Sequence, residues 1–217
     1  MKRFILITFV ALLSACASIA PTQPPLLSPF GDGSQWIVWE DIEFVAELDD
    51  HTLTSIIVPR GFVTDLASTP RTLWSIYPPF GKYLSAAILH DYLYWRQVCA
   101  PEEADKIIYQ TMRDAGVDQA TQSRFYVALR MAGDKAWADN KSEKAKGLLR
   151  VIPSSYLTPD SGLLKPNTLW PDLRIALQKA NAKEPIRLDG MQIANACKVL
   201  GKEIVVKSRI SAVAWGR

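Results

Sequence analysis

Alternating apolar and polar residues in the first quarter of the chain predict a β-hairpin. Residues 36–48 are rich in β-branched and aromatic side chains, and every second position from Ile42 onward is apolar. Residues 49–51 (Asp-Asp-His) have the composition of a turn, and residues 53–58 are apolar again. Two such runs joined by a polar turn are typical of antiparallel strands. The following segment, 59–70, begins and ends with proline and contains a glycine, which favours an ordered loop.

Helical periodicity replaces this alternation further along the chain. Residues 82–95 are apolar on nearly all sides of a helix, which is typical of a helix buried in a core. A second helix is predicted over 101–115, because the segment begins with proline and two glutamates and ends before a glycine. A third is predicted over about 118–138. Prolines interrupt the rest of the chain, where we expect only a short helix at 171–182 and a strand at 203–207.

These elements predict an α+β fold. It consists of an N-terminal β-hairpin, a small helical core with three main helices, and an irregular C-terminal extension. We expect the core to cover residues 36–138 and the extension, residues 139–217, to pack on the same domain. The composition is that of a folded globular chain, because 48% of the 217 residues are hydrophobic and 22% are charged.

The N-terminus has the features of a bacterial lipoprotein signal. Two basic residues precede an uncharged apolar run at residues 4–13, which is too short to cross a bilayer. The residues Leu13-Ser14-Ala15-Cys16 resemble the lipobox, in which the signal is cut before the cysteine and the thiol receives a diacylglyceryl group. We therefore expect residues 1–15 to be removed and Cys16 to be lipidated. An ordinary signal peptide followed by a coincidental cysteine is the alternative.

The residues after the lipobox predict how the protein is held at the membrane. Residue 17 is alanine rather than aspartate, which in an enteric-type envelope implies sorting to the outer membrane, facing the periplasm. The membrane is therefore the expected partner, through the anchor at Cys16. Residues 16–35 contain four prolines and two glycines, so they are not expected to sustain a helix or a central strand. We expect an extended tether that reaches roughly 60 Å from the lipid.

Net charge bears on a nucleic-acid partner, and the remaining cysteines bear on a disulfide and on a structural zinc site. The formal charge of +3 falls to about +1 without the two basic residues of the signal, which gives no support to a nucleic-acid partner. Cys99 and Cys197 are left after lipidation of Cys16. In an oxidising compartment they could form a disulfide, or they could remain two separate buried thiols. The sequence has no CxxC motif, which argues against a structural zinc site.

Three ionisable residues lie on otherwise apolar helical faces. His90 and Asp91 fall within the helix predicted at 82–95, and Asp105 faces inward on the next helix. A buried carboxylate needs a partner, a proton or a cation to offset its desolvation. His90 could act as a general base held by a carboxylate, or the carboxylates, with Asp65, could bind calcium or magnesium. The alternative is structural: Asp91 hydrogen-bonds the preceding loop, and His90 is a satisfied core histidine.

Two motifs of the predicted core resemble a known family. They are GFVTDLASTPRTLWSIYPPFGKYLSAAILHDYLYW at residues 61–95 and EEADKIIYQTMRDAGV at 102–117. The resemblance is to the bacterial and phage domain-of-unknown-function family 1353, and it covers about residues 36–135. It implies no activity, but it implies that a set of residues forms one motif. This set is Gly61, Phe62, Thr64, Asp65, Ser68, Pro70, His90, Asp91, Tyr94, Ala104 and Asp105.

The helix that carries His90 is also similar to the active-site helix of secretory phospholipase A-two enzymes. Residues 86–94 (AAILHDYLY) share the spacing CCxxHDxCY, with alanines and leucine in place of the cysteines. The similarity implies that His90 activates water, that Asp91 binds calcium and that Asp105 orients His90. The glycine-rich calcium loop and the disulfide framework of those enzymes are missing here, so Asp65 and its loop would have to supply the other ligands.

The leading hypothesis from sequence is therefore an envelope lipoprotein with a cation-dependent His/Asp hydrolytic site for a lipid or ester substrate. The alternative is a non-enzymatic lipoprotein that acts as a binding or assembly module in an envelope or phage-derived complex. No GxSxG, P-loop or dinucleotide motif offers another chemistry. The two hypotheses differ in whether His90, Asp91, Asp105 and Asp65 converge on a cleft or are sealed and mutually hydrogen-bonded.

Overall fold

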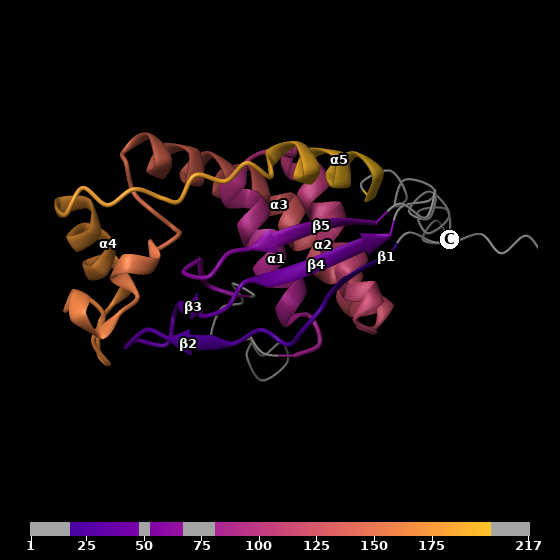
Figure 1. The fold of residues 1–217 in the computed structure, drawn as a ribbon. Helices are drawn as coiled ribbons and strands as arrows, with labels where there is room; N and C mark the ends of the chain where they lie inside the picture. The colour runs from indigo at the N-terminus through magenta and orange to yellow at the C-terminus, as the bar shows by residue number, and fades with distance from the viewer. Residues whose placement is uncertain (1–17, 48–52, 67–80, 201–217) are drawn as a thin grey trace, which may run out of the picture.

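Two small antiparallel sheets lie against a group of helices, which gives the expected α+β fold (Figure 1). The computed structural model describes residues 18–47, 53–66 and 81–200. The lipobox, Cys16 and the strand predicted at 203–207 lie outside these residues. Among the described residues, no helix combines the length and the apolar composition that crossing a membrane requires.

The predicted hairpin is confirmed in the first sheet. Strand β4 (Ile42–Glu47) pairs antiparallel with β5 (Leu53–Val58), with Ile42 opposite Val58 and Glu47 opposite Leu53. The apolar residues at every second position of β4 are buried, as its alternating pattern requires. The N-terminal part of the predicted strand is different, because residues 36–38 belong to the second sheet.

The expectation of an extended tether over residues 16–35 is wrong for most of that segment. Strand β1 (Ser18–Pro21) pairs with β4 along one edge of the first sheet, and its Ile19 is fully buried. Strand β2 (Leu27–Pro29) pairs with β3 (Trp36–Val38), again at an edge. Both new strands end at a proline, and an edge strand tolerates proline because its outer side needs no hydrogen-bond donor.

The second sheet is completed by a strand inside the predicted loop. Strand β6 (Val63–Thr64) pairs with β3, so the sheet order is β2-β3-β6. Just before it, Gly61 adopts a left-handed backbone with φ of 85°, and a β-carbon there would collide with the carbonyl oxygen of Ile152. Glycine is therefore required where this loop passes the C-terminal part of the chain.

The helices agree with the sequence pattern except near the C-terminus. Helices α1 (Leu84–Arg96) and α2 (Pro101–Asp114) match the predictions closely. Helix α3 (Gln119–Ala145) begins as expected, with Asp118 as its N-cap, but runs seven residues beyond the predicted end at Ala138. Short helix α4 (Trp170–Lys179) is confirmed. Three further helices were not predicted: η2 (Ser154–Tyr156), η3 (Pro159–Ser161) and α5 (Gly190–Leu200).

The C-terminal extension packs on the core in two places. Around α4, Trp170 and Leu173 join Ile37 and Val63 of the second sheet in one apolar cluster. From there the chain runs back along the molecule to α5, which lies beside β5 and α2 (Figure 1). A disulfide between Cys99 and Cys197 joins α5 to the loop after α1, with the two Cα atoms 6.0 Å apart.

Candidate functional site

Helix α1 places His90 and Asp91 in two different environments. The helix is buried on most of its surface, since its residues pack against the first sheet and against α2 and α3. Neighbouring residues of a helix point about 100° apart. His90 accordingly faces the following helices, whereas Asp91 faces strand β6 of the second sheet.

His90 and Asp105 form the predicted pair. The Nε2 atom of His90 lies 2.8 Å from Oδ1 of Asp105 on α2, and Asp105 is fully buried. Two further groups bind the same carboxylate. The hydroxyl of Tyr94, one turn after His90, donates to Oδ1 at 2.7 Å, and Nη1 of Arg130 on α3 donates to Oδ2 at 2.8 Å. The carboxylate is therefore held from three sides.

Packing around the pair depends on a glycine. Gly133 on α3 faces the Tyr94 hydroxyl, and a β-carbon at this position would collide with that oxygen. The Tyr94 ring also contacts the His90 ring, with centroids 4.2 Å apart, and meets the Trp137 ring edge-on at 5.1 Å. The missing side chain at position 133 thus allows α3 to approach the pair closely.

The charge of Asp105 follows from these contacts. Burial by itself raises the pKa of Asp105, but hydrogen bonds from His90, Tyr94 and Arg130 outweigh burial and lower that pKa overall. Burial and the bond to Asp105 raise the pKa of Tyr94, so its hydroxyl stays protonated and donates. We therefore expect Asp105 to be ionised although it is fully buried.

This arrangement fixes the tautomer that His90 needs to act as a base. An ionised carboxylate only accepts hydrogen bonds, so Nε2 of His90 carries the proton that faces Asp105. In the neutral ring the lone pair is then on Nδ1. Within the described part of the chain, Nδ1 has no hydrogen-bond partner, and His90 is 6% exposed. The ring therefore has one nitrogen held by Asp105 and one available to a water molecule.

Asp91 belongs to a second cluster, together with Asp65. Its Oδ2 accepts a 2.6 Å hydrogen bond from the Thr64 hydroxyl. Burial and the neighbouring Asp65 raise the pKa of Asp91 well above its usual range, while Arg150 and the Thr64 hydroxyl oppose this rise. Asp65 itself accepts a 3.0 Å hydrogen bond from Nη2 of Arg150.

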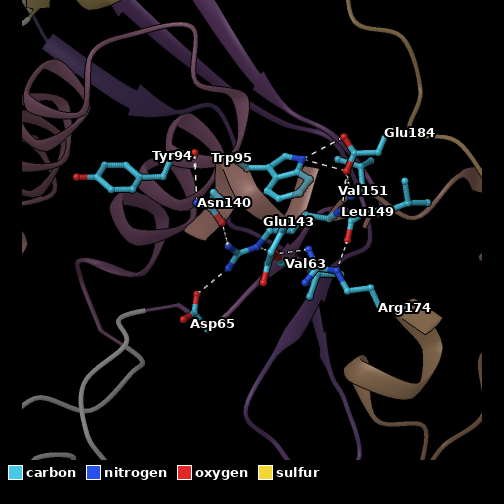
Figure 2. A network of polar contacts seen from close by, with 11 residues as sticks. Val63, Asp65, Tyr94, Trp95, Asn140, Glu143, Leu149, Val151, Arg174 and Glu184 are labelled. Atoms are coloured by element: carbon cyan, nitrogen blue, oxygen red, sulfur yellow. Dashed lines mark hydrogen bonds and ion pairs between the residues drawn. The ribbon is translucent and has the colours of Figure 1, made fainter. Parts of the chain in front are cut away.

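The Arg150 guanidinium organises this second cluster, and its partners Val63, Asp65 and Asn140 are labelled in Figure 2. It donates to the Val63 carbonyl at 2.9 Å and to Oδ1 of Asn140 at 3.2 Å, in addition to Asp65. Its own backbone N–H bonds the Glu184 carboxylate, which also accepts from the indole N–H of Trp95 at 2.9 Å. Arg150 therefore connects strand β6, helix α3 and the C-terminal extension.

The four residues proposed from sequence thus form two pairs rather than one site. The structure brings His90 to Asp105 and Asp91 to Asp65, and each pair has an arginine that the sequence analysis did not identify. Among the described residues, no group of three or more His, Cys, Asp or Glu side chains could hold a metal ion. Tyr94 could have been assigned a role, because it follows His90 by one helical turn.

Comparison with known proteins identifies the core of the chain. Residues 36–129 match the model of the family described as a protein of unknown function, DUF1353. The matched segment contains β3 to α2, most of the first half of α3, and all four candidate residues. No curated protein and no solved structure matches the chain.

Proposed function

We propose that the protein is a lipid-anchored hydrolase of the cell envelope in which His90 is the general base. The contact between His90 Nε2 and Asp105 Oδ1 carries this proposal, because it leaves Nδ1 as the basic nitrogen. The lowered pKa of Asp105 supports it as well, since an ionised carboxylate stabilises the imidazolium that forms during the reaction.

The proposed step is hydrolysis of an ester. Nδ1 of His90 takes a proton from water, and the hydroxide adds to the ester carbonyl to form a tetrahedral intermediate. Collapse of this intermediate breaks the bond to the alcohol oxygen, which leaves with the proton returned by His90. Asp105 holds the ring in place throughout, while Tyr94 and Arg130 act as positioning residues for Asp105.

A divalent cation is the second element of the proposal, with Asp91 and Asp65 as the residues that would hold it. Carboxylate oxygens suit calcium or magnesium in type, and a cation would offset the repulsion that raises the pKa of Asp91. In number they fall short of the six to eight oxygens typical of calcium, and Arg150 already neutralises Asp65. The proposed hydrolysis therefore uses only residues of the chain, and none of its steps depends on the cation.

The anchor at Cys16 would hold the domain close to the membrane. Only Ala17 separates this cysteine from β1 in the sequence, so the chain between them can span at most about 7 Å. Ser18 pairs with Glu47, and Glu47 pairs with Leu53, so one end of the first sheet would face the lipid. Leu53 at this end is 67% exposed, which suits contact with a lipid surface.

A non-enzymatic binding or assembly lipoprotein is the second candidate. The observation in its favour is the complete burial of Asp105 and the hydrogen bonds that its two oxygens accept from His90, Tyr94 and Arg130. In this case the His90–Asp105 pair stabilises the helical core and performs no reaction.

Ester hydrolysis by the full-length chain in non-ionic detergent distinguishes the two candidates. The substrates are p-nitrophenyl butyrate and phospholipid in mixed micelles, with and without calcium or magnesium. We expect His90→Asn to abolish hydrolysis while its thermal unfolding stays cooperative. Glu102→Gln, an equivalent polar change at an exposed position of α2, is the control and should retain full activity. A wild-type chain that cleaves neither substrate, or a His90→Asn variant that retains activity, contradicts the proposal.

Lipidation is tested separately through metabolic labelling with palmitate. We expect Cys16→Ser to lose the label and to remain unprocessed or to appear in the soluble fraction, because the acyl chains supply the membrane affinity. Labelling that is unchanged in Cys16→Ser contradicts the anchor.

A further inference from the structure

A cavity of about 390 Å³ lies between α3, α4 and the second sheet, and of its lining only Asp65 also takes part in the proposed function, as a residue that would hold the cation. Its volume is within the range of small-molecule sites. The lining includes two acids, Asp65 and Glu143, and two arginines, Arg150 and Arg174. His90 and Asp105 do not line it. We propose that this cavity binds a small zwitterion, namely a free amino acid or a short peptide.

The charges around the cavity suit a ligand with both signs. Arg150 pairs with Asp65 at 3.0 Å, and Arg174 pairs with Glu143 at 2.7 Å, so the formal charges of the four side chains cancel. Figure 2 shows Asp65 and Arg174 on either side of Glu143. A wholly anionic or cationic ligand would be repelled by half of these groups. A zwitterion can place its carboxylate on the arginines and its ammonium on the acids.

The arginines retain hydrogen-bonding capacity for a carboxylate. Arg150 uses three of its five N–H groups, on Val63, Asn140 and Asp65. Arg174 uses two, on the Leu149 carbonyl at 2.7 Å and on Glu143. The other N–H groups of both guanidinium groups have no acceptor within the described residues, and each ion pair joins only one nitrogen to one oxygen. Guanidinium groups with spare donors bind carboxylates well.

Packing holds Arg174 in place and adds an apolar wall. Its guanidinium lies over the rings of Trp170 and Trp95, at 5.4 and 5.7 Å from their centroids. Trp170, Leu148 and Ile175 also line the cavity, and Ile175 is 49% exposed at its rim. A ligand side chain that contacts this wall should be apolar. The cavity lies near α4, at the opposite end of the molecule from the start of β1, which follows the proposed lipid anchor at Cys16 (Figure 1). This separation from the lipid favours a dissolved ligand.

Calorimetric titration of the full-length chain in non-ionic detergent with the dipeptide alanyl-leucine tests the proposal. We expect saturable binding, and about tenfold or weaker binding of two capped analogues. N-acetyl-alanyl-leucine lacks the ammonium group, and alanyl-leucine amide lacks the carboxylate. Glycerophosphoethanolamine is a separate probe for a lipid headgroup. Absence of dipeptide binding, equal binding of the capped analogues, or preference for glycerophosphoethanolamine overturns the proposal.

Two variants locate the binding in the cavity. Glu143→Gln should weaken alanyl-leucine binding about tenfold, because the ammonium contact is lost. It should not weaken binding of N-acetyl-alanyl-leucine, because it also releases Arg174 from its ion pair with Glu143. Ile175→Glu places a negative charge at an exposed rim position and should also weaken dipeptide binding. Glu102→Gln on α2 is the matched control and should bind as the wild type does. Wild-type affinity in both Glu143→Gln and Ile175→Glu overturns the proposal. Esterase activity plays no part in this test, so either proposal can fail alone.

Discussion

Asp91 lies on α1 and Asp105 contacts α1 from α2, yet their surroundings favour opposite charge states. Asp105 is fully buried and receives hydrogen bonds from His90, Tyr94 and Arg130, which together lower its pKa despite burial. The Asp91 carboxyl accepts one hydroxyl bond, from Thr64, and another acid, Asp65, lies beside it. Burial and this acid raise its pKa.

The comparison shows that hydrogen-bond donors can outweigh the effect of burial on the charge of a carboxylate. Three donors keep Asp105 an anion, whereas one donor and a neighbouring acid leave Asp91 prone to protonation. The two pairs are therefore suited to different tasks. The charged Asp105 can orient and stabilise a histidine, whereas the Asp91–Asp65 pair favours the uptake of a proton or a cation.

Removal of the Asp105 carboxylate should have the largest effect. Asp105→Ala leaves His90, Tyr94 and Arg130 without their acceptor, and we expect a loss of about 3–5 kcal/mol in the free energy of unfolding. Urea denaturation at pH 7 measures it. Asp105→Asn keeps the size of the side chain and should lower the free energy of unfolding by less than Asp105→Ala does. Because the folded pKa of Asp105 is lowered, its stabilisation is present above about pH 3.9 and is lost as the pH falls through the folded pKa. A loss below 1 kcal/mol contradicts this account.

Breaking the disulfide tests whether the Asp105 cluster depends on α5. Cys197→Ser should cost about 2–4 kcal/mol, because the bond joins residues 98 positions apart and restricts the unfolded chain. Cys99 lies in the loop after α1, and the disulfide takes no part in the hydrogen bonds of Asp105. The losses for Cys197→Ser and Asp105→Ala should therefore add to within about 0.5 kcal/mol in the double variant. Coupling above about 1 kcal/mol would mean that α5 positions the cluster.

Local patterns predicted that His90 and Asp105 face inward, and the similarity to the phospholipase helix supplied their pairing. Helices α1 and α2 are specified by their apolar periodicity and end signals, so the inward direction of both side chains follows from the sequence. The arginine partners could not be found in this way. Arg130 reaches Asp105 from 25 residues away, and Arg150 reaches Asp65 from 85 residues away, so both contacts depend on how distant segments pack.

The second sheet was beyond sequence analysis for a related reason. Its strands are two or three residues long, too short for alternation to be recognised, and β2 ends in proline. Proline excludes a central strand, but not the edge positions that β1 and β2 occupy. The metal site inferred for Asp91 and Asp65 shares the difficulty, because the sequence did not reveal that Arg150 binds Asp65.

Two tyrosines of α1 allow a measurement of how much one hydrogen-bond donor to Asp105 contributes to the free energy of unfolding. Tyr94→Phe removes the hydroxyl that donates to Oδ1, and we expect a loss of about 1.5–3 kcal/mol, as for a hydrogen bond to a charged group. Tyr92→Phe is the matched control. Its hydroxyl is buried and has no partner among the described residues, and burial raises the pKa of Tyr92 to about 12. This second variant should be neutral or slightly more stable in urea denaturation. Equal losses in the two variants would contradict the role of Tyr94.

The smallest effect is expected from Asp91→Asn, and its sign should depend on pH. The folded pKa of Asp91 is raised, so its contribution to stability is full below about pH 3.9 and is lost as the pH rises through the folded pKa. The amide cannot ionise, so the variant should be at least as stable as the wild type at pH 7. At pH 4 it should lose no more than the hydrogen-bond difference at Thr64, about 0.5–1.5 kcal/mol.

Thermal unfolding from pH 4 to pH 8 measures the difference in stability between Asp91→Asn and the wild type, and repeating it with calcium tests the cation. If Asp91 and Asp65 hold calcium, the ion should stabilise the wild type at pH 7 and leave Asp91→Asn unchanged. A variant that is less stable than the calcium-free wild type at pH 7 would show that the Asp91 carboxylate is already well compensated, and the contrast with Asp105 would disappear.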